Sequence, residues 1–194
     1  MVNDIHGLAD TVPLQSSKKK LPTDTTDGTP KKKINSKSKG SAYERKIANL
    51  LSNRFKDLLG IEKGFRKSVD SGAFFGGSNH SRTETYDTSM ATFGDIICPQ
   101  NFSYSIECKH YKSSPSFQSI INQNVKEWDT WLAQAEQDSV KSSKKMLLII
   151  KYNNVDDFIF LKEKLDIPCV LVYKYNYCYK LSDWLKLSDN TFFT

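Results

Sequence analysis

Two acidic residues and a lysine are spaced as they are in metal-dependent hydrolytic sites. Asp95 lies in the run Gly94–Ile97 and is followed, nine residues after that run, by Glu107 and Lys109. Side chains alternate along a strand, so Glu107 and Lys109 are expected to share one face. If the two segments pair as a hairpin around Asn101, Asp95 falls opposite Glu107 on that face.

Two neighbouring carboxylates repel each other unless a hard cation lies between them. Mg²⁺ suits such a site because it takes one or two carboxylates and fills its octahedron with water and phosphate oxygens, and Mn²⁺ is expected to substitute. Lys109 would contact a scissile phosphate and help to orient or deprotonate the attacking water. The alternative for Glu107 and Lys109 alone is a surface ion pair on an exposed hairpin.

A third carboxylate, Glu44, precedes this pair in the chain. It lies on the same stripe of a predicted helix as Ile47 and Leu51, where a charged group is costly unless it is paired or serves a metal. The alternative is a capping box, in which Glu44 bonds back to the backbone of Ser41 at the start of the helix.

Hydrophobic periodicity predicts an α/β domain, with a central mixed sheet flanked by helices on both faces. The aromatic side chains of Trp128 and Trp131 are expected to pack in its core. The expected helices span 41–60, 118–138 and 155–165, with a last one from Ser182, and the expected strands span 65–69, 95–98, 104–109, 146–152, 169–175 and 177–181.

Residues 1–40 differ in composition from the domain predicted over 41–194. They carry eight Lys and four Asp within a chain of net charge +6, and they have few apolar residues. We expect a disordered basic tail that contacts phosphates. Its lysine triplets 18–20 and 31–33 leave a nuclear-import signal, and so a nuclear location, as an alternative.

The rest of the composition indicates a soluble protein of a reducing compartment, hence cytoplasmic, associated with the nucleoid or, if viral, in the host cytoplasm. No apolar stretch approaches the ~20 residues that span a bilayer, and no signal peptide is evident. Cysteines stand only at 98, 108, 169 and 178, with no C-x-x-C pair. We expect all of them to be reduced core residues.

Five segments together resemble the archaeal-type Holliday-junction resolvases, which belong to the PD-(D/E)xK nuclease superfamily. Lys39–Arg45 is similar to the opening of their first helix, and Arg66 with Ser71–Ala73 resembles their arginine and Ser/Gly loop. Gly94–Ile97 and Ile106–Lys109 resemble their metal-binding hairpin. Phage and viral nucleases of the superfamily share the Ser-Gly loop, the G-D-I strand and a helix bearing Trp and Gln.

The resemblance, which covers roughly residues 39–151, implies a restriction-endonuclease-like core and a division of roles. Asp95 and Glu107 would bind the metal, Glu44 would complete the acidic set as a further metal ligand and catalytic residue, and Lys109 would be the catalytic lysine. Ser71 would reach the phosphate from the Gly- and Ser-rich segment Ser71–Phe93, which is longer than the corresponding resolvase loop. The expected nucleic-acid contacts are Arg66, Ser71, Gly72, Gln134 and Lys151; for Gln134 and Lys151 the alternative is a solvated surface side chain.

The expected function is a Mg²⁺-dependent endonuclease that acts on branched DNA as a homodimer, since a four-way junction needs two symmetric cuts. One alternative is a restriction-, repair- or recombination-type DNA nuclease of the same fold, because fold alone does not settle the substrate. Another is a non-catalytic nucleic-acid-binding module.

Overall fold

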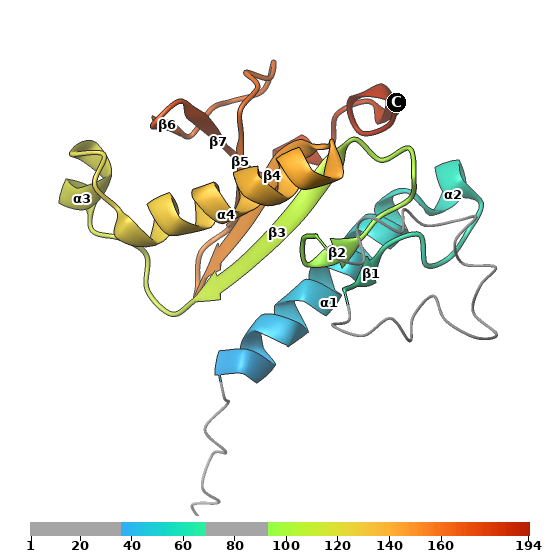
Figure 1. The fold of residues 1–194 in the computed structure, drawn as a ribbon, viewed down its shortest axis with the longest axis horizontal. Helices are drawn as coiled ribbons and strands as arrows, with labels where there is room; N and C mark the ends of the chain where they lie inside the picture. The colour runs from blue at the N-terminus through green and yellow to red at the C-terminus, as the bar shows by residue number, and fades with distance from the viewer. Residues whose placement is uncertain (1–35, 69–92) are drawn as a thin grey trace, which may run out of the picture. The chain divides into compact units, whose positions relative to one another are not determined.

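A mixed five-stranded sheet forms the centre of the chain (Figure 1). The structure, a computed structural model, describes residues 36–68 and 93–194. Within these ranges no helix is long and apolar enough to cross a membrane. The elements are α1 (Ser36–Arg54), α2 (Lys56–Leu59), β1 (Arg66–Lys67), β2 (Ile96–Ile97), β3 (Tyr104–Tyr111), α3 (Phe117–Ile121), α4 (Lys126–Ser142), β4 (Lys145–Tyr152), β5 (Asp157–Leu161), β6 (Leu171–Tyr173), β7 (Asn176–Lys180), α5 (Leu181–Trp184) and a 3-10 turn (Asp189–Thr191).

The strands follow the order β3-β4-β5-β7-β6, so β3 is an edge strand. β3 and β4 run parallel, and α3 and α4 make the crossover that a parallel connection needs. The pairs β4–β5, β5–β7 and β7–β6 are antiparallel. The predicted mixed α/β sheet is therefore confirmed, and it is consistent with a restriction-endonuclease-like core.

Helices pack on both faces of this sheet, as the sequence predicts. On one face α1 and α5 contribute Ile47, Leu51 and Trp184 to an apolar cluster with alternate residues of β3, β4 and β5. On the other face α4 contributes Trp128 and Leu132 to a second cluster, which uses the intervening residues of β4 and β5. Figure 1 shows α4 crossing this second face. Both tryptophans of α4 are buried, in agreement with the expected packing role.

The helix predicted over 155–165 is wrong, because this segment contains strand β5. Its run of apolar residues suits either structure in isolation. The segment is a strand because it pairs with β4 on one side and β7 on the other. In that position Ile159 packs into one apolar cluster and Phe160 into the other.

Two helix boundaries also differ from the prediction. Ser36–Gly40, which we assigned to the tail, form the first turns of α1, while residues 1–35 lie outside the described residues. The helix predicted over 118–138 is divided into α3 and α4, with Gln123 at a φ of 52° between them. Ile121, at the end of α3, is 58% exposed.

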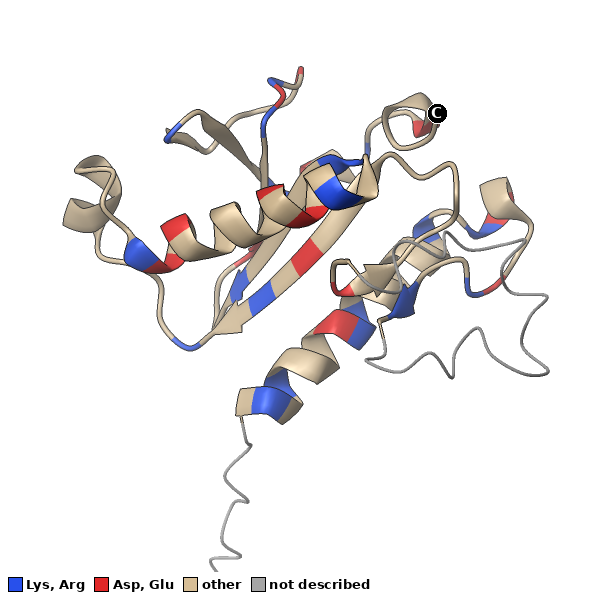
Figure 2. Ribbon diagram, viewed as in Figure 1, with Lys and Arg blue, Asp and Glu red and all other residues tan. Residues whose placement is uncertain are grey.

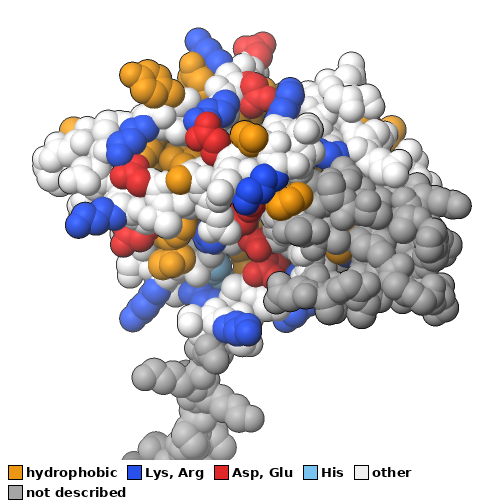
Figure 3. Space-filling view, in the orientation of Figure 1, with side chains coloured by type: hydrophobic (Ala, Val, Ile, Leu, Met, Phe, Trp, Pro, Cys, Tyr) orange, Lys and Arg blue, Asp and Glu red, His pale blue; other side chains and the backbone are white. Residues whose placement is uncertain are grey.

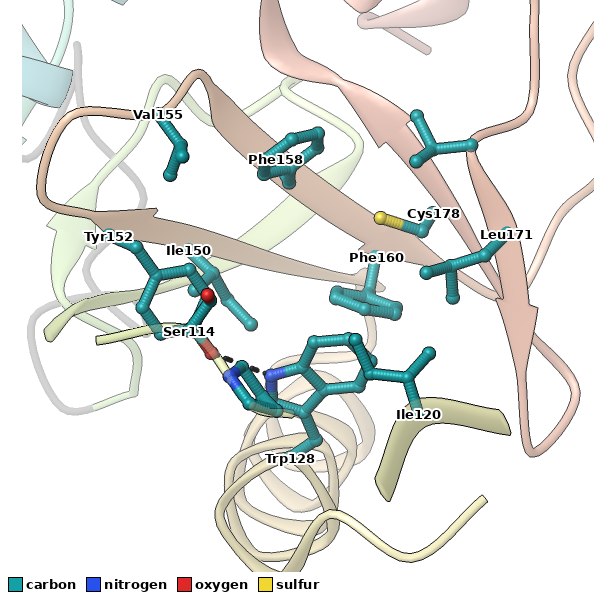
Figure 4. Close-up of a pocket in the computed structure, with 12 residues that line it drawn as sticks. Ser114, Ile120, Trp128, Ile150, Tyr152, Val155, Phe158, Phe160, Leu171 and Cys178 are labelled. Carbon is teal, nitrogen blue, oxygen red and sulfur yellow. Dashed lines mark hydrogen bonds between the residues drawn. The ribbon is translucent and has the colours of Figure 1, made fainter. Parts of the chain in front are cut away.

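An apolar cavity of about 160 Å³ lies between α4 and the sheet (Figure 4). Trp128 and Phe160 line it, and the Trp128 indole N–H donates to the Tyr152 hydroxyl at 2.7 Å. Cys178 also lines it and is buried, like two of the other cysteines, and all four cysteines are free. Cys169 is exposed, so the expectation of a core position is wrong for this residue.

Candidate active site

Asp95 is attached to the open edge of β3 by its backbone and its side chain. Its backbone N–H donates to the Ile106 carbonyl at 2.8 Å, and its Oδ2 accepts from the Cys108 backbone N–H at 2.8 Å. Two backbone groups on the open edge of β3 are thus satisfied by one residue. On these contacts alone Asp95 would serve only to cap the edge of the sheet. The charged groups near its carboxylate indicate what chemistry it can do.

The predicted hairpin between the segments around Asp95 and Glu107 is wrong in its pairing. β2 pairs with β1, with Arg66 opposite Ile97, and forms a separate two-stranded sheet. β3 instead pairs with β4, which lies far away in the sequence, and the two strands are paired over eight residues. The longer β3–β4 pairing and the burial of both faces of that sheet stabilise the chain more than a local hairpin would. Asp95 still contacts β3.

Gly94 makes this attachment possible. Its φ is +77°, and a Cβ added there would lie 2.8 Å from the Ile106 carbonyl oxygen. A side chain would therefore push Asp95 away from the strand that it caps, in addition to the strain of a left-handed backbone.

We expect Gly94→Ala to lower the free energy of unfolding by about 2–3 kcal/mol, because it combines backbone strain with a contact against rigid backbone. Gly60→Ala is the matched control, since Gly60 has a φ of +66° but nothing within 4 Å of the added Cβ. That control should cost only about 1 kcal/mol. Urea unfolding of both variants measures the difference, and equal losses would show that the close approach of Gly94 to β3 is not important.

Glu107 and Lys109 form an ion pair on the α4 face of β3. Lys109 Nζ lies 2.5 Å from Glu107 Oε1, and it also donates to Gln134 Oε1 of α4 at 3.1 Å. Glu107 is only 2% exposed, which contradicts the alternative of a surface ion pair on an exposed hairpin. A buried carboxylate with so few compensating groups is costly for stability, so a functional reason for it is the stronger interpretation.

The carboxylates of Asp95 and Glu107 influence each other's ionisation. Burial and then the charge of Asp95 raise the pKa of Glu107 to about 7, against the opposing effect of Lys109. Burial and the nearby charge of Glu44 also raise the pKa of Asp95, against the Cys108 hydrogen bond and the charges of Lys109 and Lys67. Without a further cation the pair holds protons more tightly than isolated carboxylates do.

The pKa of Lys109 responds in the opposite sense. Burial lowers it, but the hydrogen bond to Glu107 and the charges of Glu107 and Asp95 more than offset this, so the net change is upward. Lys109 is thus held as an ammonium next to both carboxylates, where it stabilises negative charge.

Glu44 points from α1 toward the same place but is paired with a residue that the sequence did not single out. Its Oε2 lies 2.9 Å from Lys67 Nζ of β1, and the side chain is 18% exposed. The capping-box alternative is wrong because α1 begins at Ser36 and not at Ser41. Ser41 lies within the helix and accepts a hydrogen bond from Arg45 at 2.8 Å.

The donor set of Asp95 and Glu107 fits a magnesium-like ion. In the ranges 36–68 and 93–194 no three His, Cys, Asp or Glu side chains converge closely enough for a fully protein-ligated metal site. Mg²⁺ does not need one, because it keeps several waters and is usually bound by one or two carboxylates together with substrate phosphate. Such an ion would relieve the repulsion between the two carboxylates.

The remaining predicted residues lie in different places. Gln134 is brought to Lys109, and Arg66 is half-buried in β1 beside Lys67. Lys151 is not brought to the carboxylates by any contact described: it pairs with Asp157 at 2.8 Å, on the α1 face of the sheet. The remaining two, Ser71 and Gly72, lie with the rest of the 71–92 segment outside the described residues.

Two charged residues that sequence reasoning missed also act on the site. Lys67 contacts Glu44 and lowers the pKa of Asp95, and Asp138 of α4 raises the pKa of Glu107. Neither has a spacing relative to the motif that would identify it, since both are brought in by tertiary packing. Figure 2 shows acidic and basic residues on both β3 and α1, and Figure 3 shows acidic side chains grouped near the centre of this face with basic ones around them.

Comparisons with known proteins found one matching family and a similar solved structure. Residues 35–191 match the family described as "Phage putative PDDEXK endonuclease". A structure of Archaeoglobus fulgidus Hjc, a Holliday junction resolvase from an archaeal hyperthermophile, aligns over 74% of this chain and 89% of that chain, with 16% identity and a TM-score of 0.33. No curated protein matches the chain. Since the family match covers most of the sequence, including Asp95, Glu107 and Lys109, the chain belongs to this family of phage PD-(D/E)xK endonucleases.

Proposed function

We propose that this protein is a divalent-metal-dependent endonuclease that hydrolyses DNA phosphodiester bonds. The observation that carries the proposal is the burial of Glu107 beside Asp95, with Lys109 held against it at the open edge of β3. Structural ion pairs rarely place two carboxylates in one buried position, whereas a metal-assisted hydrolase requires them there.

In the proposed mechanism the side chains of this chain have separate tasks. Asp95 and Glu107 would bind Mg²⁺, with Glu44 completing the acidic set. Mn²⁺ is expected to be able to replace Mg²⁺. When bound, the ion supplies positive charge to the phosphate and lowers the pKa of a water molecule. Lys109 donates to the phosphate or to the attacking water, and Gln134, already hydrogen-bonded to Lys109, fixes the position of its ammonium.

For the substrate we propose branched DNA, cut by a homodimer. This rests on the resemblance of the Lys39–Arg45 run and of the motif segments to junction resolvases, and a four-way junction needs two symmetric cuts. Arg66, Ser71, Gly72 and Lys151 remain proposed DNA contacts.

A panel of DNA substrates tests both parts of the proposal. Purified protein is incubated with Mg²⁺ or Mn²⁺ and with labelled four-way junction, linear duplex or single strand. We expect cleavage of the junction at the highest rate, with paired symmetric cuts. Equal rates on junction and duplex would contradict the branched-DNA proposal and favour a restriction- or repair-type nuclease. DNA binding without cleavage under every condition would instead favour a non-catalytic binding module.

A further inference from the structure

Asp95 lies between two lysine–carboxylate pairs that come from different parts of the chain. On one side Lys109 pairs with Glu107, both from β3, at 2.5 Å. On the other side Lys67 of β1 pairs with Glu44 of α1 at 2.9 Å. Both ammonium groups lower the pKa of Asp95, so both act on the same carboxylate.

The position of Lys67 is fixed by more than its ion pair. Its Nζ also donates to the Ser68 carbonyl at 2.9 Å, and the Ser68 N–H donates to the Asp95 carbonyl at 2.8 Å. The backbone of Lys67 pairs with Ile96, the residue after Asp95. The side chain is 29% exposed and so can be reached from solvent, and its charge acts on the Asp95 carboxylate.

We infer that Lys67 is a second phosphate-binding lysine of this site, and that Glu44 is the positioning residue that holds it. This inference rests on the proposed nuclease function. Its ligand class is the phosphate oxygens of the nucleic-acid backbone, which a lysine binds as a point charge.

The charges at the site support this assignment. Glu44, Asp95 and Glu107 contribute three negative charges when all are ionised, and Lys67 and Lys109 contribute two positive ones. A divalent cation then changes the net charge from −1 to +1, which complements a singly charged phosphodiester. Without Lys67 the loaded site would be neutral and would lose this attraction.

The geometry also separates Glu44 from the other two carboxylates. Glu107 belongs to the same strand as Lys109 and is 2% exposed, whereas Glu44 comes from α1, its side chain is 18% exposed and its Oε2 lies 2.9 Å from Lys67 Nζ. Glu44 is therefore better suited to hold Lys67 than to serve as a ligand of the metal itself.

Four variants test the inference: Lys67→Met, Lys67→Arg, Glu44→Gln and the double variant Glu44→Gln/Lys67→Met. The matched control is Lys56→Met, which removes a lysine paired with Glu62 at 3.2 Å outside the site. Three quantities are measured: duplex and junction affinity in Ca²⁺, the single-turnover cleavage rate in Mg²⁺, and Mn²⁺ affinity by titration calorimetry. Thermal unfolding of each variant checks that it folds.

We expect Lys67→Met to weaken DNA binding and to reduce the single-turnover rate by about 10- to 100-fold. Lys67→Arg, which keeps the charge, should recover most of both, and Lys56→Met should behave like the wild type. Glu44→Gln should weaken DNA binding in the same direction and lose little further when combined with Lys67→Met, because the two residues act as a unit. Neither single change should weaken Mn²⁺ binding by more than a few-fold.

Three results would overturn the inference. Wild-type DNA affinity and rate in Lys67→Met would show that Lys67 does not contact phosphate. Additive losses in the double variant, or a loss of Mn²⁺ affinity in Glu44→Gln as large as that in Glu107→Gln, would make Glu44 an independent metal ligand. A wild-type protein that binds DNA but never cuts it removes the nuclease function alone, and the affinities still decide the role of Lys67. A wild-type protein that binds no DNA would contradict both the nuclease function and the role of Lys67.

Discussion

Glu107→Gln is expected to abolish DNA cleavage, with a loss of about 10²-fold or more in single-turnover rate. The substitution keeps the size of the side chain and a hydrogen-bond acceptor for Lys109, whose Nζ lies 2.5 Å from the carboxylate. It removes the negative charge that a metal ion needs, so transition-state stabilisation is lost while the fold is retained. Asp95→Asn and Lys109→Ala should have losses of similar size.

Stability against pH gives a second readout of Glu107 that does not depend on activity. Its pKa is raised from 4.5 to about 7 by burial and by the charge of Asp95. For a group whose pKa is raised on folding, the stabilising contribution is fully present below the unfolded-state pKa and is lost as pH rises through the folded-state value. In EDTA the wild type should therefore lose stability between about pH 4.5 and 7.

Glu107→Gln should lack this loss, so the metal-free variant should become more stable than the wild type at pH 8. Urea unfolding across this pH range measures the difference. Glu62→Gln is the control, because Glu62 forms an exposed pair with Lys56 away from the site. Full cleavage activity in Glu107→Gln, or an unchanged pH dependence of its stability, would show that Glu107 is a structural residue with no metal to bind.

Removal of divalent metal is expected to stop cleavage completely and to lower the melting temperature. The first effect follows because none of the described side chains that act on Asp95 is an activated nucleophile, so the attacking water depends on the metal. The second follows because a cation between Asp95 and Glu107 relieves the repulsion that raises the pKa of Glu107. Mg²⁺ and Mn²⁺ should restore both, and Ca²⁺ should restore stability and DNA binding without turnover.

Asp95→Asn is the control for this experiment, since the amide can still accept the Cys108 hydrogen bond but loses the charge. Its melting temperature should be nearly independent of metal. Sustained cleavage by the wild-type protein in excess EDTA would contradict a metal mechanism. An equal rise in melting temperature for the wild type and Asp95→Asn would place the metal elsewhere.

Local pattern was sufficient to predict much of the catalytic strand. Alternation along a strand puts Glu107 and Lys109 on one face, and the structure pairs them there. The period of the apolar residues likewise predicted the helix that carries Glu44 and the buried strand β4. These features depend on neighbours within one element, where the spacing of side chains is set by the helix or strand itself.

Partner choice between elements was decided only by the tertiary structure. Asp95 was expected in a hairpin with β3, but β2 pairs with β1, and Asp95 is attached to the edge of β3 by hydrogen bonds to Ile106 and Cys108. The segment Asp157–Leu161 became a strand because β4 and β7 lie on either side of it. A short apolar run satisfies more than one structure, and long-range hydrogen bonds and burial select among them.

The pairing of Glu44 with Lys67 is of the same kind. Glu44 was predicted to lie at the site by the stripe of its helix, and the sequence also allowed a bond to Ser41. The earlier start of α1 removes that alternative, and packing of β1 against α1 supplies the lysine. The sequence determined which charged residues the chain carries and how they are spaced within each element. Which of these charges form pairs was decided by the packing of distant segments, because an ion pair forms only when the fold brings both groups within a few ångströms.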